Sequence, residues 1–343
     1  MNVLILETTC DETAAAVVND RLEVLASVVA SQDALHRRFG GVVPELASRA
    51  HVERIVPVID EALRRAKLPL GAIEAVAVAT TPGLAGSLLV GLMAAKTLSL
   101  VLGRPLVAVN HLQAHVYACR LAAGRDVFPC VALVVSGGHT SLYRCGGPLE
   151  FEPLGSTIDD AAGEAFDKVA SMLGLPYPGG PSISHAAAEG DPQAYRFPRP
   201  MLDDERLDFS FSGLKTAVRY QIAGAGRIDF TQLRLSPRQV ADLAASFQEA
   251  VVDCLVGKAL QAVERTSLRT LCVGGGVAAN ARLRERLAEE STRRGVELHV
   301  APPRLCTDNA VMGAIAIERL KAGLVEPLDL DVQPGVVRTT SPP

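Results

Sequence analysis

Two histidines four residues apart, His111 and His115, have the residue type and the spacing that metal chemistry requires. If their segment is helical, both imidazoles lie on one face, one turn apart. Two neutral imidazoles placed in this way can bind a single metal ion. Leu112 occupies the position at which the metallopeptidase motif has a glutamate as general base. The pair therefore indicates a metal site that is not a peptidase site, although two ordinary helix histidines have the same spacing.

Loops rich in glycine or acidic residues follow three apolar runs, at residues 7–13, 136–140 and 274–280. In the third loop, glycines end a strand-like run and precede a helical pattern, so a ligand can approach the backbone at a helix N-terminus. This geometry suits the ribose, base or phosphate of a nucleotide. It is not the dinucleotide-binding pattern G-x-G-x-x-G, because Ala279 stands where a later glycine is needed. A glycine cluster alone is a weak indicator of such a site.

The elements that must position these loops follow a pattern that occurs twice. Predicted strands at 3–6, 14–18 and 22–29 are matched by predicted strands at 131–135, 140–144 and 149–154. A helical pattern follows each set, at 44–67 and at 159–173. Two related α/β lobes would place the first two loops on opposite walls of one cleft. A chance likeness of two hairpins is the alternative, since hairpins are common.

Length and composition favour a soluble α/β protein with two lobes. The chain has 343 residues, of which 48% are hydrophobic, 21% charged and 4% aromatic. A net charge of -4 provides no general attraction for nucleic acid. A nucleic-acid partner would have to bind local basic clusters such as Arg37-Arg38, residues 282–286 or Arg293-Arg294. Each of these clusters is also typical of a solvated helix face.

The sequence favours a cytoplasmic location. Seven cysteines without a C-x-x-C pair indicate buried thiols in a reducing compartment. The N-terminus lacks a basic region and reads as a first strand, not a signal peptide. Residues 84–102 are apolar enough to suggest a membrane span, but Lys96 lies inside them and Pro82-Gly83 precedes them like a helix start. We expect a buried helix there and no membrane association.

Further motifs occur in a fixed order around the histidine pair. They are ETTCDET at 7–13, GGVVPELASR at 40–49, TPGL at 81–84, VSGGHT at 135–140, DDAAGEAFDK at 159–168, YPGGP at 177–181, FSFSGLKT at 209–216, GGGVAAN at 274–280 and TDNA at 307–310. In this combination the chain resembles, over nearly its whole length, the tRNA N6-adenosine threonylcarbamoyltransferases, formerly called O-sialoglycoprotein endopeptidases. So many motifs in one order make coincidence negligible.

The resemblance implies two ribonuclease-H-like lobes of the fold shared by actin, sugar kinases and chaperone ATPases, around a central cleft. It implies an N-terminal lobe of residues 1–125, against which a C-terminal helix of about 308–343 packs, and a second lobe of residues 126–307 with inserted helices. It further implies transfer of a threonylcarbamoyl group from threonylcarbamoyl-AMP to N6 of the adenosine next to the anticodon, position 37, in tRNAs that read codons beginning with A.

The resemblance also implies the ligands. His111, His115 and Asp308 would hold one divalent metal ion, usually Fe²⁺, with Zn²⁺ as the alternative. The donor would be bound by Val135, Ser136, Gly137, Gly138, His139, Asp167, Gly180 and Asn280. Gln113-Ala114 replace the commoner Glu-Gly, and Thr9 replaces the commoner serine. Neither position is a ligand in the family, so we expect activity to be retained.

The residue types suit this chemistry. Backbone N–H groups at 136–138 can bind the adenylate phosphate, and we expect the adenylate to lie between this loop and the Gly275, Gly276 and Asn280 loop on a facing lobe. Asp11 and Glu12 are candidates to accept the proton of the attacking amine, although acidic residues in such a loop can simply fix a turn.

Other functions and partners follow from the same fold. A small-molecule kinase or ATPase is the main alternative, but its metal is usually magnesium held by oxygens, which the histidine pair disfavours. A scaffold that recruits proteins through the helices at 44–67 and 84–102 is another, and a metallopeptidase is the weakest. The resemblance implies two protein partners, the smaller paralogue TsaB and the P-loop ATPase TsaE, with weak, salt-sensitive tRNA binding completed by a partner.

Overall fold

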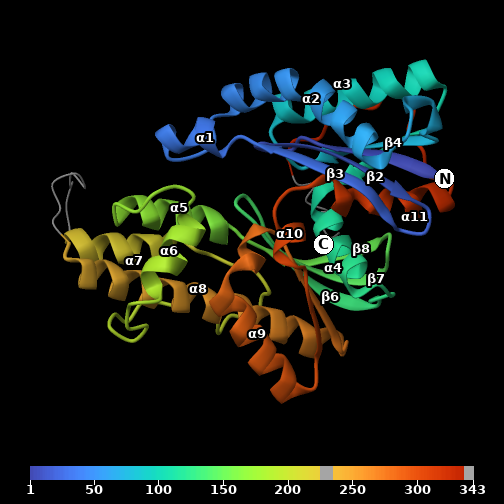
Figure 1. The fold of residues 1–343 in the computed structure, drawn as a ribbon. Coiled ribbons are helices and arrows are strands. Elements are labelled where there is room, and N and C mark those ends of the chain that lie inside the picture. The colour runs from blue at the N-terminus through green and yellow to red at the C-terminus, as the bar shows by residue number, and fades with distance from the viewer. Residues whose placement is uncertain (225–234, 336–343) are drawn as a thin grey trace. The chain divides into compact units, whose positions relative to one another are not determined.

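The computed structural model describes residues 1–224 and 235–335. The chain divides into two compact units (Figure 1). Unit 1 combines Met1–Leu121 with the segment that begins at Thr307, and unit 2 is Ala122–Cys306.

The sheet of unit 1 has the strand order β3-β2-β1-β4-β5. Its strands are β1 Asn2–Glu7, β2 Glu12–Asn19, β3 Val24–Ser31, β4 Ala75–Thr81 and β5 Leu106–Asn110. The first three strands form an antiparallel meander, and β4 and β5 run parallel to β1. The strands predicted at 3–6, 14–18 and 22–29 are confirmed, except that β3 begins two residues later, because Leu22 adopts a left-handed turn conformation with φ 64°.

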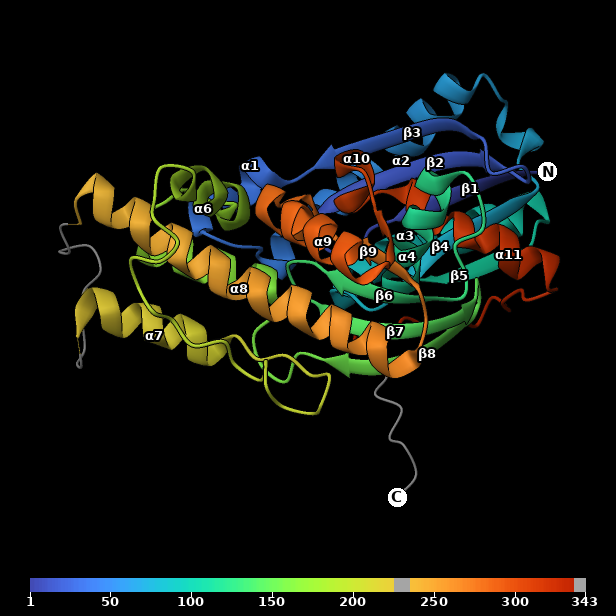
Figure 2. The same ribbon diagram turned by 90° about the horizontal axis from the view of Figure 1, so that it is seen from below.

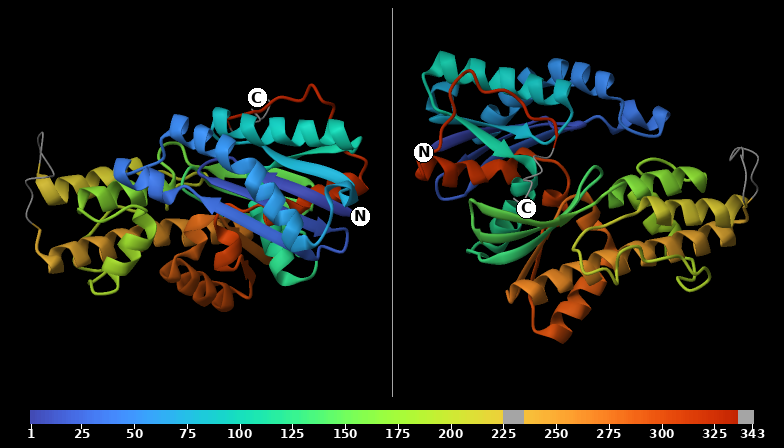
Figure 3. Two further views of the ribbon diagram at one scale, coloured as in Figure 1. Left: turned by 45° about the horizontal axis from the view of Figure 1, so that its top comes forward. Right: turned by 180° about the vertical axis from the view of Figure 1, so that it is seen from behind.

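Two long helices, α2 Pro44–Ala66 and α3 Ala85–Leu102, lie side by side on one face of this sheet (Figures 1 and 3). Their apolar residues, with those of β1, β2 and β4, form the core of unit 1. The helix expected at 84–102 is present, but it is buried on one face only, since Leu89 and Met93 are exposed on the other. By length and composition alone, α3 is the one helix in the described residues that could cross a membrane, and such evidence from a single helix is weak.

The C-terminal segment of unit 1 is less helical than expected. The predicted helix over about 308–343 is, within the described residues, a 3₁₀ turn η5 Ala310–Ile315 that continues into α11 Ala316–Lys321. Gly323, with φ 72°, follows α11, and Pro327 and Pro334 disfavour further helix. η5 packs closely on β1, since a Cβ at Gly313 would lie 2.6 Å from Ile5 Cγ2.

The sheet of unit 2 has the order β10-β9-β6-β7-β8. Its strands are β6 Cys130–Val135, β7 Thr140–Gly147, β8 Glu150–Ser156, β9 Thr270–Gly274 and β10 Glu297–Val300. An antiparallel meander of three strands is again followed by two strands parallel to the first. The predicted strands at 131–135, 140–144 and 149–154 are confirmed. Because all five strands of both sheets share one topology, the chance likeness of two hairpins is excluded.

The helices of unit 2 surround this sheet and extend beyond it. They are α5 Ala162–Met172, α6 Gly179–Ala187, α7 Ser212–Ala223, α8 Pro237–Thr266, η4 Gly276–Ala279, α9 Ala281–Arg294 and α10 Pro303–Cys306. The long helix α8 packs against the sheet at one end and against α6 and α7 at the other (Figure 2). The helix predicted from 159 begins at Ala162, because Asp159 instead accepts hydrogen bonds from Ser210 and Ser212.

Candidate functional site

Two helix starts hold the predicted metal ligands of unit 1. Helix α4, His111–Ala123, begins at the end of β5, where Asn110 Oδ1 accepts hydrogen bonds from the backbone N–H groups of Leu112 and Gln113. Asp308 directly precedes Asn309, whose side chain caps η5 through the N–H of Met312. Both caps fix the backbone next to a predicted ligand, His111 in one case and Asp308 in the other.

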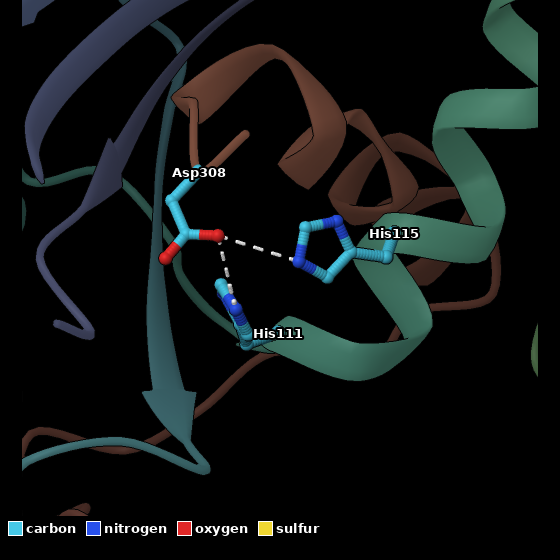
Figure 4. Close-up of side chains that lie close together, drawn as sticks. All are labelled: His111, His115 and Asp308. Atoms are coloured by element: carbon cyan, nitrogen blue, oxygen red, sulfur yellow. Dashed lines mark ion pairs between the residues drawn. The ribbon is translucent and has the colours of Figure 1, made fainter. Parts of the chain in front are cut away.

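The structure brings His111, His115 and Asp308 together (Figure 4). The Nε2 atoms of His111 and His115 lie 3.5 Å and 3.4 Å from Asp308 Oδ1. The imidazole rings meet at 76°, with centroids 4.6 Å apart. One ligand atom from each residue lies within 4.8 Å of the others, so the three could coordinate a single cation.

Two observations show that this cluster fits a metal ion. His115 is fully buried, and both of its ring nitrogens lack a hydrogen-bond partner among the described residues. Nε2 has only the Asp308 carboxylate near it, at 3.4 Å, and a buried nitrogen that makes no hydrogen bond is costly unless something else binds it. The Nδ1 atom of His111 lies 3.2 Å from the buried carboxylate of Glu7, which leaves Nε2 directed to Asp308. A carboxylate behind the imidazole is the usual support of a metal-binding histidine.

The electrostatics of the cluster also favour a cation. Burial disfavours the charged form of His111, but the carboxylates of Asp308 and Glu7 outweigh burial and raise its pKa to about 9. Burial lowers the pKa of His115, which keeps this imidazole neutral, as a metal ligand must be. The negative field that acts on His111 would act equally on a divalent ion.

A second group of acidic side chains lies in unit 1 and consists of Asp11, Glu12 and Asp33. Burial, with Asp308 and Asp11 as neighbouring carboxylates, raises the pKa of Glu12 well above its usual range. Asp33 begins the short helix α1, Asp33–His36, and no sequence motif connected it with the loop at 7–13. The pairing of Glu12 with Ser31 in the β2–β3 hairpin brings α1 beside this loop.

In unit 2, the loop at 136–139 exposes its backbone at the end of β6. Ser136 N–H donates to His139 O at 2.8 Å, which closes the loop. Gly163 in α5 lies so close that a Cβ there would be 2.6 Å from Ser136 O. Gly137 and Gly138 are exposed, and a Cβ on either would meet nothing within 4 Å. Val135 is fully buried, so only its backbone can meet a ligand.

The predicted donor-binding residues Asp167, in α5, and Gly180, in the first turn of α6, meet at the start of α6. Asp167 Oδ1 accepts a hydrogen bond from Gly179 N–H at 2.7 Å, which fixes the N-terminus of this helix. A Cβ on Gly179 would lie 2.5 Å from the Asp167 Cα, whereas one on Gly180 would meet nothing within 4 Å. Gly180 therefore leaves open space at a helix N-terminus, where N–H groups attract anions.

The glycine loop after β9 lies beside the loop after β6, not opposite to it. Strands β6 and β9 are parallel neighbours, with Val134 paired to Gly274. Gly275, at φ 96°, is so close to the end of β6 that a Cβ would lie 2.3 Å from Val135 O. The expectation that these two loops stand on facing lobes is therefore wrong, since both belong to unit 2.

The side chain of Asn280 is already engaged within unit 2. Its Oδ1 accepts from Leu283 N–H at 2.9 Å and caps α9, while its Nδ2 donates to Ser184 Oγ and Gln248 Oε1, each at 2.8 Å. If this amide bound the threonylcarbamoyl-group donor, that contact would have to replace one of these hydrogen bonds. Asn280 also holds α6, α8 and α9 together around the loop, a role that its place after the glycines did not reveal.

Two compact units with sheets of common topology define a protein of the actin-like ATPase fold. Among solved structures, HypF of T. kodakarensis matches with a TM-score of 0.62 and 15% identity, covering 94% of this chain and 47% of that one. Component A of (R)-2-hydroxyglutaryl-CoA dehydratase from Acidaminococcus fermentans matches with a TM-score of 0.55 and 14% identity, covering 94% of this chain and 99% of that one. At such identities the likeness concerns the fold alone.

The sequence comparisons are more specific. Residues 23–315 match the family described as TsaD, tRNA N6-adenosine threonylcarbamoyltransferase. A protein of that name from Rhodopirellula baltica is 55% identical, covering 98% of this chain and 97% of the relative. Another from Syntrophobacter fumaroxidans is 52% identical, covering 97% and 99%. The chain belongs to the TsaD family.

Proposed function

We propose that this enzyme transfers a threonylcarbamoyl group from threonylcarbamoyl-AMP to N6 of adenosine 37, next to the anticodon, in tRNAs that read codons beginning with A. The observation that carries the proposal is the family match over residues 23–315, together with relatives of that activity at 52–55% identity over nearly the whole chain. No observation favours the small-molecule kinase or ATPase alternative. The pairing of two histidines with one carboxylate also differs from the oxygen ligands that kinases supply to magnesium.

His111, His115 and Asp308 hold one metal ion in this proposal. Two imidazoles and one carboxylate with open positions are the ligand set of ferrous iron, so we propose Fe²⁺, with Zn²⁺ as the alternative. When bound, the metal supplies a Lewis acid that polarises oxygens of the donor and steadies developing negative charge. Glu7 positions the His111 imidazole from behind, at 3.2 Å.

Unit 2 binds the adenylate half of the donor. The exposed backbone of Gly137 and Gly138 receives the phosphate, beside Ser136, whose own N–H closes the loop on His139 O. The start of α6 at Gly180 adds a second group of backbone N–H groups. The β9 loop, beside the β6 loop in the same sheet, receives the adenosine. Asp167 and Asn280 keep these loops in place through their hydrogen bonds to Gly179 and Leu283.

The chain then aligns a weak nucleophile with an activated carbonyl. N6 of the adenosine forms a bond to the carbonyl carbon, the bond from that carbon to the phosphate oxygen breaks, and AMP leaves with the electron pair. The proton of the amine passes to a carboxylate of the Asp11 and Glu12 pair. Burial and neighbouring carboxylates raise the pKa of Glu12, which makes it the poorer acceptor at neutral pH, so we assign this role to Asp11.

The partners and the location belong to the same proposal. An apolar groove of about 920 Å³ lies between α2 and α3, away from the His111 cluster. With exposed Val52, Val56, Leu89 and Met93 around it, this surface suits a protein partner better than a nucleotide. We assign it to the smaller paralogue TsaB, with the P-loop ATPase TsaE completing the system in the cytoplasm, where tRNA is found.

Binding of the adenylate can be tested at Gly137, whose Cβ position is open. We expect Gly137→Val to fold with an unchanged melting temperature but to bind AMP at least about tenfold more weakly, since a branched side chain blocks the backbone donors. Isothermal titration calorimetry with AMP measures the effect. Gly71→Val, at another open and exposed glycine in unit 1, is the matched control. If the unaltered chain, Gly137→Val and Gly71→Val bind AMP with equal affinity, the loop at 136–138 is not part of the adenylate-binding site.

The function itself is tested by mass spectrometry of nucleosides from tRNA of cells depleted of the protein. We expect threonylcarbamoyladenosine to fall to a small fraction of its normal level and to return when the gene is restored. An unchanged level of this nucleoside would contradict the proposed function and favour the kinase alternative.

A further inference from the structure

The arginine clusters noted in the sequence differ in whether acidic side chains pair with them. Arg282 and Arg286 both contact Glu249, at 2.7 Å and 2.6 Å. Arg293 contacts Glu290 at 2.5 Å, and Arg294 pairs with Glu264. Their charge is largely compensated within unit 2. These clusters are therefore poor phosphate-binding surfaces, although the sequence alone made them equal candidates.

Arg37 and Arg38 differ from these clusters. They are exposed on the 3₁₀ turn η1, Arg37–Phe39, and neither side chain makes an ion pair or hydrogen bond with any residue that the structure describes. The guanidinium of Arg38 lies over the Phe39 ring, 4.7 Å from its centroid. Phe39 itself is 52% exposed, which is unusual for a phenylalanine. The turn presents two uncompensated cations and an aromatic face to solvent.

The base of this turn is firmly held. The buried His36 contacts Gln32 Oε1 through Nε2 at 3.2 Å and receives the Val43 N–H at Nδ1, at 3.3 Å. Gln32 and His51 continue this network, and His51 Nε2 lies 3.0 Å from the carbonyl oxygen of Cys10. The exposed turn is therefore anchored to the loop that carries Asp11 and Glu12.

The turn also lies near the proposed proton acceptors. Asp33, in the helix that leads into η1, belongs to the carboxylate group of Asp11 and Glu12. Arg37 follows Asp33 by four positions, about one helical turn, or roughly 5–6 Å along the axis. An RNA base at the carboxylates would thus place its neighbouring nucleotides at the turn.

We propose that Arg37, Arg38 and Phe39 bind the anticodon loop of the tRNA, with the arginines on backbone phosphates and Phe39 stacked on an unpaired base beside the target adenosine. Proteins read single-stranded RNA loops with this combination of cations and aromatic faces. The inference rests on the proposed function and adds to it the surface that receives the substrate.

The test uses the full chain together with TsaB and TsaE, and an unmodified tRNA whose anticodon reads a codon beginning with A. Fluorescence anisotropy gives the affinity over a range of salt concentrations. We expect Arg37→Gln/Arg38→Gln to bind tRNA at least about tenfold more weakly. The salt slope, which is the slope of log affinity against log salt concentration, should become shallower by about 1.4, or about 0.7 for each lost phosphate contact. We expect Phe39→Ala to lose about tenfold in affinity with an unchanged slope, and Phe39→Trp to restore binding.

The control is Arg293→Gln/Arg294→Gln, which removes two arginines that are already paired. We expect its tRNA affinity and salt slope to match those of the unaltered chain. The assignment of this surface is wrong if the η1 variants bind tRNA as tightly as the unaltered chain, or if the control variant loses as much affinity as they do. Either result leaves the proposed function intact, provided that the unaltered chain still modifies tRNA. If the unaltered chain neither binds nor modifies tRNA with both partners present, the proposed function fails as well.

Discussion

His115→Ala is expected to lose its bound metal and, with it, threonylcarbamoyl transfer. The imidazole is fully buried and has no hydrogen-bond partner among the described residues, so its removal takes away a ligand without breaking a hydrogen bond. We expect at least about a hundredfold loss in metal affinity, beyond the effect of removing a supporting residue. Elemental analysis of the purified protein measures the bound metal, and circular dichroism verifies the fold.

Asp308→Asn makes the same test without a cavity, since it keeps the shape of the side chain and removes its charge. His185→Ala, at an exposed histidine of α6, is the control and should keep a full complement of metal. If the His115→Ala and Asp308→Asn proteins are folded and retain all of their metal, the three residues are not the ligands.

Metal affinity should also depend on pH in a defined direction. The pKa of His111 is raised to about 9 in the metal-free protein, so this imidazole is protonated at pH 7 and must release a proton to coordinate. The affinity should therefore rise about tenfold per pH unit between pH 7 and 9 and level off above. Glu7→Gln removes one of the carboxylates that raise this pKa, so the dependence should shift to lower pH.

Asp11→Asn is expected to reduce the rate of transfer to tRNA by about 10²–10⁴, the usual loss when a general base is removed. Binding of tRNA should not change, because the amide keeps the size of the carboxylate. Glu12→Gln should have a smaller effect, since the amide mimics the protonated form that a raised pKa favours at neutral pH.

Single-turnover assays with preformed threonylcarbamoyl-AMP separate this chemical step from binding. Asp20→Asn, in an exposed turn of unit 1, is the matched control. A rate for Asp11→Asn within about twofold of the unaltered enzyme would show that this loop only fixes a turn, as the sequence also allowed.

The sequence predicted local structure well where the pattern was periodic. Both strand meanders could be recognised because apolar runs broken by turn residues are local signals, and the histidine helix because its four-residue spacing is another. Asp33 could not be connected with Glu12, since their proximity depends on the register of β2 and β3. Likewise, the spacing of Ser136 and Gly275 gave no sign that parallel pairing of β6 and β9 makes them neighbours.

The helix boundaries and the role of Asn280 show a second limit. Asp159 would serve as an N-cap by type, yet it bonds to a segment fifty residues away, so α5 begins later. Asn280 has the position expected of a ligand, yet its amide caps α9 and bonds Ser184 and Gln248. Polar side chains have several possible partners, and tertiary structure decides among them.

Unit 1 is built from both an N-terminal and a C-terminal segment, and this affects how it forms during synthesis on the ribosome. Strand β1 and helix α4 emerge early, but η5, which covers the other face of this sheet, and Asp308 follow only after the whole of unit 2. At about 5–20 residues per second, the nascent unit 1 waits roughly ten to forty seconds with an apolar sheet face uncovered and one metal ligand missing. During this interval the growing chain needs protection from aggregation, and the candidate metal site is complete only once Asp308 has been made.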